Sequence, residues 1–157
     1  MKILTELNQY RYLALLEVGE TDDWKFRMLL AEMQVLDKPT LVSIDKQPNE
    51  AVRALLAGTN PIEISDKSAI YEVTFEDYVM YSVRNESYVH GNDYDEYEGK
   101  LFRVYSQSQF LDFLNISTFA AQDFPGPFKH YGFITSDHIV DIASVEPPNV
   151  TRVDKNA

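Results

Sequence analysis

The residues most able to perform chemistry stand where the apolar pattern of the sequence breaks off. The run YEVTFEDYVMYSVRNESY ends in Arg84, Asn85, Glu86 and Tyr88, which His130 and Asp141 can join across the predicted sheet. A carboxylate beside an imidazole can act as a general acid–base pair, and burial tunes both groups. Glu86 and His130 are therefore the alternative catalytic residues. A structural ion pair between Arg84 and Glu86 would instead leave the chain without a catalytic residue.

The two histidines His130 and His138 raise the question of a metal site. They belong to a predicted hairpin in which residue 134 pairs with 138 or 139, so that His130 faces about residue 142. This places the histidines roughly 13 Å apart along the strands, whereas zinc needs nitrogens about 2 Å from the ion. We therefore expect no metal and no cofactor, and we expect the ring nitrogens to bond neighbouring backbone or carboxylate groups.

A short acidic segment with interleaved tyrosines follows the first cluster. Its residues are Asp93, Tyr94, Asp95, Glu96, Tyr97 and Glu98. The segment has enough carboxylates for a hard cation, but it lacks the DxDxDG spacing and the distal glutamate of a calcium-binding EF-hand. Tyrosine supplies a large contact area at little entropic cost. The segment is therefore a candidate protein-binding surface, and a solvated loop is the alternative.

Other catalytic and binding motifs are absent from the sequence. It contains no GxSxG, P-loop, GxGxxG or HExxH pattern, and it has no cysteine for a thiolate nucleophile or a disulfide. Ser82, Ser87 and Ser136 could in principle serve a hydrolase, but no local signature supports any of them.

The strands that would position these residues are read from alternating polarity. In Tyr71–Phe75 and Val79–Val83 the odd-numbered residues are apolar or aromatic and are expected to face the core. Further strands are predicted at Leu101–Tyr105, in the hairpin His130–Ile134 with Ile139–Ala143, and at the short segments Thr40–Asp45 and Ile62–Ser65. Residues 91–99 are predicted to form an acidic loop.

Helices are expected in the first and last thirds. Residues 10–18 favour a strand, although 4–16 could form a helix instead. An amphipathic helix is predicted after Thr21-Asp22-Asp23, with Phe26, Leu29, Leu30, Met33 and Leu36 on one stripe. A second helix starts at Pro48-Asn49-Glu50 and carries Val52, Leu55 and Leu56. In a third, Ser106 and Gln109 form a capping box before Phe110, Leu111, Phe113 and Leu114, which are expected to be buried.

The order of these elements predicts the fold class. Helices at both ends and consecutive strands in the middle indicate an α+β protein, a mostly antiparallel sheet with about three helices packed on one face. We expect a single domain over residues 1–157, because this length suffices for one core. The tail after about residue 148 follows Pro147-Pro148 and is expected to be frayed.

Composition and charge limit the possible partners. The chain carries a net charge of −11, and residues 72–98 hold eight acids against Arg84 alone, a net of −7. Such a surface repels nucleic acid and anionic lipid and attracts basic proteins, although it could also serve solubility alone. No apolar run is long enough for a signal peptide or a membrane span. We therefore expect a cytoplasmic protein that binds neither nucleic acid nor membrane.

Two stretches of the sequence carry a resemblance. FEDYVMYSVRNESY (75–88) and GPFKHYGFITSDHIVDIASVEPPNV (126–150), with a helix motif formed by Ser106, Ser108, Phe110, Leu111 and Asp112 between them, resemble a family of small, acidic, uncharacterised bacterial proteins. This resemblance implies no activity, and no catalytic residue is carried over from it. In size, charge and aromatic content the chain is also similar to immunity proteins that neutralise toxins.

Three functions follow as hypotheses. The first is a non-enzymatic, immunity- or inhibitor-like module that binds a basic protein through the acidic, tyrosine-rich middle of the chain. The second is a small enzyme with Glu86 and His130 at one end of the sheet. The third is a homodimer built through the sheet, for which ten tyrosines and nine phenylalanines supply contact area. A deep pocket at Glu86 would favour the enzyme, and a flat acidic face would favour the partner.

Overall fold

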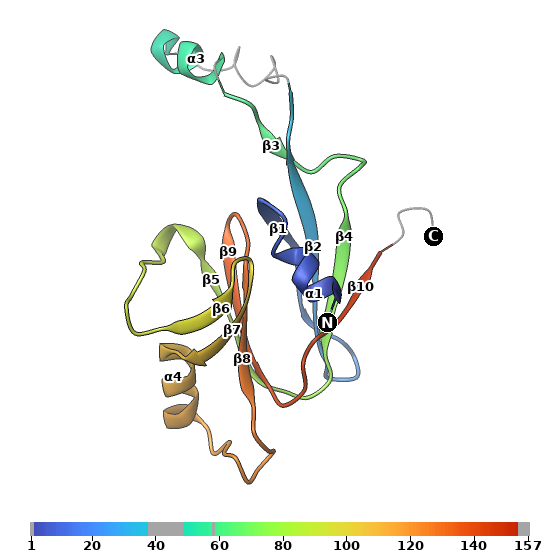
Figure 1. Ribbon diagram of the computed structural model, residues 1–157, viewed down its shortest axis with the longest axis vertical. Coiled ribbons are helices and arrows are strands. Elements are labelled where there is room, and N and C mark those ends of the chain that lie inside the picture. The colour runs from blue at the N-terminus through green and yellow to red at the C-terminus, as the bar shows by residue number, and fades with distance from the viewer. Residues whose placement is uncertain (1, 38–48, 58, 154–157) are drawn as a thin grey trace.

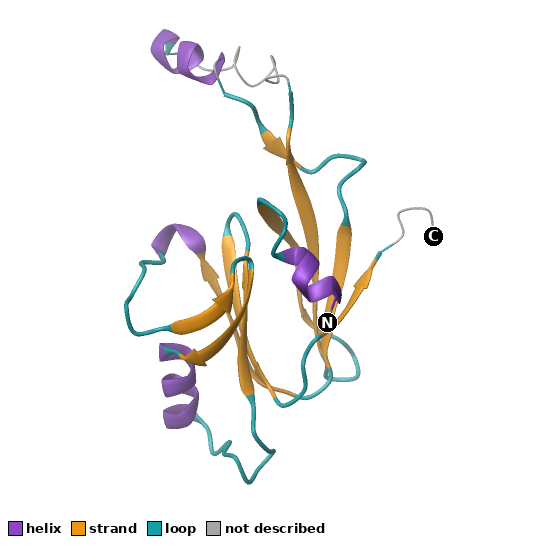
Figure 2. Ribbon diagram, viewed as in Figure 1, coloured by secondary structure: helices purple, strands orange, loops and turns teal. Residues whose placement is uncertain are grey.

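The computed structural model describes residues 2–37, 49–57 and 59–153 and consists mainly of two antiparallel sheets. The first sheet has the order β1-β2-β4-β10, with β3 paired to the end of β2, and the second has the order β5-β9-β8-β7-β6. Figures 1 and 2 show the two sheets side by side, with few helices among the described residues. A mostly antiparallel strand architecture is thus confirmed, but the strands form two sheets.

The strands of the first sheet come from both ends and the middle of the chain. They are β1 (Tyr12–Glu20), β2 (Phe26–Val35), β3 (Ile62–Glu63), β4 (Ile70–Phe75) and β10 (Asn149–Arg152). The second sheet is built from the later half. Its strands are β5 (Tyr78–Asn85), β6 (Glu96–Gly99), β7 (Phe102–Gln107), β8 (Lys129–Ile134) and β9 (His138–Ser144).

One hydrophobic core lies between the two sheets. Phe26 and Phe75 of the first sheet meet Tyr81, Tyr131 and Phe133 of the second, with ring centroids 4.8 to 6.4 Å apart. Apolar side chains on alternate strand positions point into this space, which explains the strict alternation of buried and half-buried residues along β4. Six of the sixteen buried residues of this core are aromatic, and each large ring contributes more buried area than an aliphatic side chain.

The first helix, α1 (Lys2–Leu7), joins the two sheets at one end of the core. Leu7 is fully buried in the core, and the Tyr71 hydroxyl donates to Glu6 at 2.6 Å. In the turn after the helix, the side-chain oxygen of Asn8 accepts hydrogen bonds from three consecutive backbone amides at 2.8 to 2.9 Å. Those amides belong to Lys100, Leu101 and Phe102 before and at the start of β7. The strand predicted at residues 10–18 is therefore confirmed as β1, whereas the alternative helix over 4–16 is wrong beyond Leu7, where α1 ends.

The helix predicted after Thr21 is wrong, because residues 26–35 form the central strand β2. Thr21 donates its backbone amide to Lys25 at 2.9 Å, so the capping-like sequence forms the turn of a hairpin between β1 and β2. Phe26, Met28 and Leu30 are buried at every second position, as expected for a strand. Residues 26–36 contain apolar residues at both this spacing and the spacing of an amphipathic helix. Hydrogen bonds to β1 on one side and β4 on the other override the helical propensity of Met, Leu and Ala.

The expectation of a frayed tail is wrong for residues 149–152. These residues form β10, which pairs with β4 so that Val150 lies opposite Val73, and Val150 is buried. Pro147 and Pro148 lie before β10 and do not prevent it from forming. Each proline lacks only its own amide donor, and the strand begins at the next residue, Asn149. The predicted strand at residues 40–45 and the predicted helix start at Pro48 lie outside the described residues.

The helices do not pack together on one face. α3 (Glu50–Ala57) projects at the far end of the molecule from α4 (Gln109–Ser117), as Figure 1 shows. Asn49 caps α3 through hydrogen bonds from the amides of residues 51 and 52, which agrees with a helix starting near residue 49. The α+β description therefore holds only in the coarse sense of separate strands and helices.

The inward face of β5 was predicted correctly for Tyr81 but not as far as Val83. Tyr81 packs against Phe26 in the core, whereas Val83 is 38% exposed. β5 is an edge strand of its sheet, and Val83 lies near its end, where solvent reaches the side chain. A charge at Val83 is consequently expected to cost much less free energy of unfolding than a charge in a sealed core.

Candidate functional site

Three buried residues, Ser108, His130 and Asp141, form a hydrogen-bonded chain that we call the buried polar chain; it ends at Arg84, whose side chain is 49% exposed. Ser108 Oγ lies 2.8 Å from His130 Nδ1, and His130 Nε2 lies 2.9 Å from Asp141 Oδ1. The other carboxylate oxygen of Asp141 accepts from Nε and Nη2 of Arg84, each at 2.9 Å. The chain thus runs from the start of α4 across β8 and β9 to the edge strand β5.

Strand register brings these residues together on the face of the second sheet that points away from the core. Asp141 lies opposite Gly132 on one side and Ser82 on the other, and Tyr105 lies opposite His130. The ring of Tyr105 stacks on His130 with centroids 4.0 Å apart, and it also covers Gly132. A side-chain carbon at residue 132 would approach the Tyr105 ring to 2.8 Å, so glycine is needed there for this close approach.

Helix α4 closes the buried polar chain from outside. Ser108 is the N-cap residue of α4, and its Oγ accepts from the Leu111 amide at 3.1 Å. Phe110 places its ring 4.6 Å from that of His130, and Leu114 is fully buried. The sequence placed the cap at Ser106; the structure moves it two residues on, which turns the side chain of Ser108 toward His130.

The buried polar chain has the residue types of a serine hydrolase but not its accessibility. Ser108 and His130 are each 1% exposed and Asp141 is 0% exposed, so a substrate has no path to the hydroxyl. The Ser108 oxygen is also engaged by the helix amide, whereas a nucleophile must have a lone pair directed at the substrate. The arrangement satisfies buried polar groups and ties α4 to the sheet, which is a structural role.

The structure brings only part of the first predicted cluster together. Arg84 pairs with Asp141, and Asp141 with His130, but Glu86 lies apart. The Glu86 amide donates to Asp137, whereas His130 faces Ala143, six residues further along β9 and so roughly 20 Å away. Glu86 and His130 therefore do not form an acid–base pair.

The remaining residues of that cluster lie at the surface. Asn85 caps the short 3-10 helix η1 (Glu86–Tyr88) by accepting a hydrogen bond from the Ser87 amide at 3.0 Å. Glu86 is exposed, and Tyr88 is exposed over 86% of its surface. No ion pair joins Arg84 to Glu86 among the described side chains; Arg84 is held by Asp141 instead.

The acidic segment is more ordered than a solvated loop. Asn92 accepts hydrogen bonds from the amides of Tyr94 and Asp95, and the Asp95 carboxylate accepts from the Gln109 amide at the first turn of α4. A carboxylate at a helix N-terminus is favourable because unpaired amides and the helix dipole point at it. Asp95 therefore has a structural role, while Asp93, Glu96 and Glu98 stay exposed.

Tyr94 and Tyr97 are held in place while their rings remain accessible. The pKa of Tyr94 is raised above its usual value, chiefly by its hydrogen bond to Asp112 of α4 and then by burial. The guanidinium of Arg103 lies 4.1 Å from the centroid of the Tyr97 ring, a cation–π contact. The loop predicted for residues 91–99 is therefore only partly correct, because residues 96–99 form the edge strand β6, which pairs with β7.

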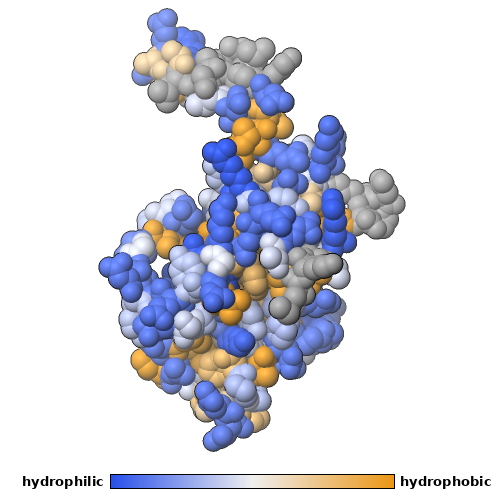
Figure 3. All heavy atoms as spheres, in the orientation of Figure 1, coloured by the Kyte–Doolittle hydropathy of each residue, from blue (hydrophilic) through white to orange (hydrophobic). Residues whose placement is uncertain are grey.

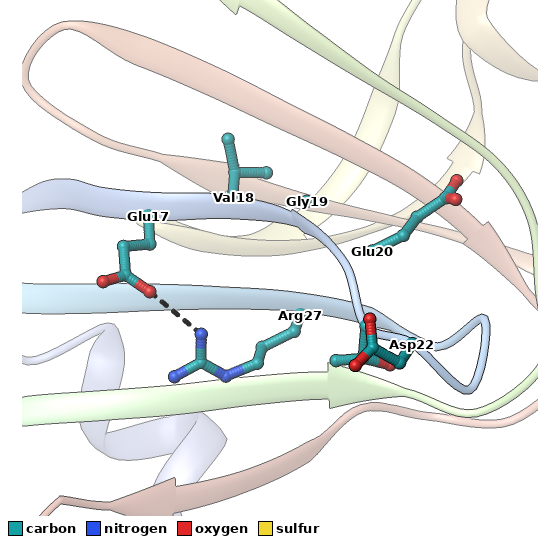
Figure 4. A pocket seen from close by; sticks show the side chains of 7 residues that line it. Glu17, Val18, Gly19, Glu20, Asp22 and Arg27 are labelled. Atoms are coloured by element: carbon teal, nitrogen blue, oxygen red, sulfur yellow. Dashed lines mark hydrogen bonds and ion pairs between the residues drawn. The ribbon is translucent and has the colours of Figure 1, made fainter.

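A separate hollow on the first sheet was not singled out by the sequence. It lies at the end of β1, as Figure 4 shows, and measures about 570 Å³. Arg27 crosses it and binds Glu17 at 2.9 Å and, on its other side, Glu72 at 2.6 Å. Because the one basic side chain is already neutralised by two carboxylates, the hollow offers a mainly acidic, solvent-open surface.

Ser108 is the residue of the buried polar chain that sequence reasoning did not assign. It was recognised only as part of the helix motif, and its position directly before Gln109, where the helix begins, is the signal that could have identified it as the cap.

Within the described ranges, no three His, Asp or Glu side chains converge as metal ligands. None of the described helices has the length and apolarity needed to cross a bilayer. Comparison with known proteins finds no matching family model, curated protein or solved structure.

Proposed function

We propose that this protein is a non-enzymatic binding module, immunity- or inhibitor-like, that recognises a basic protein partner. Its contact surface is the acidic face, which consists of Tyr88, Asp93, Tyr94, Glu96, Tyr97 and Glu98. All six residues are exposed and lie on η1, on β6 and on the segment between them. The observation that carries the proposal is this exposure, set against the sealing of Ser108, His130 and Asp141.

The charges of the acidic face suit rapid association. The six residues of the acidic face include three carboxylates, Asp93, Glu96 and Glu98, and no lysine or arginine. A one-signed surface raises the rate of encounter with an oppositely charged partner through its long-range field. The carboxylates therefore govern mainly the association rate.

The tyrosines of the acidic face suit retention of the partner. The Tyr97 ring contacts the Arg103 guanidinium and the Tyr105 ring, and the backbone of Tyr94 is hydrogen-bonded to Asn92 and Gln107, so little freedom is lost when a partner covers them. Pre-ordered aromatic side chains are common anchors at interfaces, and their truncation mostly speeds dissociation. The tyrosines therefore govern mainly the lifetime of the complex.

The test begins with a pull-down from native lysate at about 0.05 M and about 0.5 M salt, because salt screens steering between exposed charges. With the salt-sensitive partner in hand, association rates are measured for the wild type and for the triple variant Asp93→Asn, Glu96→Gln and Glu98→Gln. Asp95 is left unchanged because it binds the first turn of α4. We expect the triple variant to associate more slowly at low salt and to approach the wild type at high salt.

A matched control separates local steering from total charge. Asp22→Asn, Glu50→Gln and Glu63→Gln remove three exposed carboxylates from the β1–β2 turn, α3 and β3. This control should associate nearly as fast as the wild type. Equal rates for the triple variant and the wild type at low salt, or recovery of no basic protein, would contradict the proposed function.

A further inference from the structure

The strongest unassigned feature of the surface is a group of large apolar side chains at the end of α4 and in the segment after it. We call it the apolar patch; it consists of Phe113, Ile116, Phe119 and Phe124, which are 60%, 86%, 85% and 63% exposed. Figure 3 shows apolar atoms gathered over this part of the molecule, at the lower left. Scattered single apolar residues are ordinary on surfaces, whereas a group of large exposed apolar side chains is often functional.

The patch is built by the outer side of the helix that seals the buried polar chain. Leu114 points inward and is fully buried, whereas Phe113 and Ile116 point outward at a spacing of three residues. The rings of Phe119 and Phe124 stack with centroids 6.0 Å apart, so they hold each other in place without a cover from the rest of the chain. The prediction that Phe113 is buried was therefore wrong.

A hollow beside the patch gives it depth. It measures about 400 Å³ and lies between the start of β5, at Tyr78 and Val79, and the segment that carries Phe119 and Phe124. Such a hollow has room for one or two apolar side chains of a partner. A flat apolar surface would give less contact per residue than this combination of ridge and hollow.

The area of the patch matches what a stable interface requires. Its four side chains expose about 500 Å² of apolar surface, taking roughly 150–250 Å² for each large side chain. A standard interface buries about 800 Å² on each partner, of which somewhat more than half is apolar. The patch can therefore supply the apolar centre of one interface.

The patch adjoins the acidic face through α4. The Asp95 carboxylate binds the first amide of the helix, and Ile116 lies within its last turns. Residues 109–128 contain Asp112 and Asp123 but no lysine or arginine, and Asp77 lines the hollow. The apolar centre is thus bordered by carboxylates alone within these residues, which favours a positively charged occupant over a second copy of a chain with net charge −11.

We propose that the apolar patch binds the apolar side of a basic amphipathic segment of a protein partner. This inference rests on the proposed function and names the partner's chemistry: apolar side chains that fill the hollow, flanked by lysine or arginine that meets the acidic face. The apolar contacts supply most of the affinity, because exposed charge pairs contribute little once formed.

A defined probe tests this without the natural partner. The probe is a fluorescein-labelled helical peptide of 18 residues made of Leu and Lys, and a second peptide of equal charge has Ser in place of Leu. Binding to the full chain is followed by fluorescence anisotropy. We expect the Leu/Lys peptide to bind at least about tenfold more tightly than the Ser/Lys peptide, because only the Leu side chains can fill the hollow and cover the apolar patch.

Variants assign the binding to the patch. Ile116→Ser with Phe119→Ser should weaken Leu/Lys binding at least about tenfold. Trp24→Ser is the matched control, because Trp24 is a large exposed aromatic, 77% exposed, on the distant β1–β2 turn; this variant should bind as the wild type does. Unchanged affinity in the Ile116/Phe119 variant, or equal affinity for the two peptides, would overturn the inference.

The same assay separates this inference from the proposed function. Suppose that Asp93→Asn, Glu96→Gln and Glu98→Gln leave peptide binding and its salt dependence unchanged, while the Ile116/Phe119 variant no longer binds. The proposed role of the acidic face is then refuted, and the proposed role of the apolar patch is supported. If only the triple variant loses binding, the patch fails and the acidic face stands. A concentration-dependent dimer in light scattering that disappears in the Ile116/Phe119 variant would show that the patch binds a second copy of this chain. That result would overturn the proposal of a basic partner.

Discussion

Helix α4 separates two regions with opposite properties. On its inner side, Ser108, His130 and Asp141 have the side chains of a catalytic triad, yet each is at most 1% exposed and bonded to the next. On its outer side, Phe113 and Ile116 have no polar or reactive group, yet they are exposed to solvent, as are the nearby carboxylates of Asp112 and Asp123. Accessibility, and not residue type, decides which of the two regions can meet another molecule.

The comparison also explains why both regions occur on one helix. A short helix is marginal on its own and needs tertiary contacts for its stability. The buried polar chain and Leu114 supply those contacts on the inner side, which leaves the outer side free of any structural requirement. The inner side therefore fixes the helix, and the outer side can be used for binding.

The largest expected effect comes from breaking the buried polar chain at its centre. Asp141→Ala breaks the buried pair with His130, whose Nε2 is left without its partner, and frees Arg84, whose side chain is 49% exposed; it should lower the free energy of unfolding by about 3–5 kcal/mol, mostly through His130. Urea unfolding followed by circular dichroism measures this. Asp137→Ala, four residues away at an exposed position, is the control and should change stability by less than about 0.5 kcal/mol. A loss below about 1 kcal/mol for Asp141→Ala would show that the chain is not structural.

The two sides of α4 can be compared directly by removing one aliphatic side chain from each. Leu114→Ala leaves a cavity at a fully buried site and should lower the free energy of unfolding by about 2–5 kcal/mol. Ile116→Ala, two residues on, should change it by no more than about 0.5 kcal/mol. Equal losses in urea unfolding would mean that the outer side of the helix is also packed, and the division between the two regions would be wrong.

A smaller effect is expected at the helix cap. Ser108→Ala removes both the bond to the Leu111 amide and the bond to His130, and should cost about 1–3 kcal/mol. Ser106→Ala is the matched control, because Ser106 is the cap that the sequence predicts and the structure leaves exposed on β7. If Ser106→Ala were the more destabilising of the two, the observed cap would be wrong.

The smallest effect concerns alkaline pH at Tyr78, which lines the hollow beside the apolar patch. Burial, followed by a hydrogen bond to Glu20, raises the pKa of Tyr78 to about 12. The unfolded chain ionises near pH 10, so the stability that neutral Tyr78 contributes is complete below pH 10 and is lost between about pH 10 and 12. Tyr78→Phe should therefore lose less stability than the wild type over this range in urea unfolding at fixed pH values. An identical pH dependence for both proteins would contradict the account of this side chain.

Much of the second sheet could be predicted from sequence. The hairpin of β8 and β9 and the strands β5 and β7 follow from alternating polarity and clear turn residues, and residue 134 pairs with 139, one of the two partners predicted for it. β2 could not be predicted, because its apolar residues satisfy both a helical and a strand spacing. The strand wins over the helix only because β2 pairs with β1 on one side and with β4, far along the sequence, on the other.

The candidate site was predicted in its members but not in its connections. His130, Asp141 and Arg84 were recognised together, and the two ring nitrogens of His130 do bond a neighbouring carboxylate and a hydroxyl. The role given to Glu86 depended on the length of β5, which continues two residues past Val83 and carries Glu86 away from His130. Phe113 was expected inside because a helical stripe shows which residues share a side, but not which of them the sheet covers.

The most direct test of the account sets stability against binding in two variants of α4. Ser108→Ala and the Ile116→Ser/Phe119→Ser variant are each measured by urea unfolding and by anisotropy with the Leu/Lys peptide at about 0.05 M salt and 25 °C. We predict that Ser108→Ala is less stable than the wild type but, while folded, binds the peptide with the same affinity. The Ile116/Phe119 variant should be as stable as the wild type and bind at least about tenfold more weakly. Loss of binding in folded Ser108→Ala, with binding retained in the Ile116/Phe119 variant, would contradict the claim that the inner side of α4 serves stability and its exposed side serves binding.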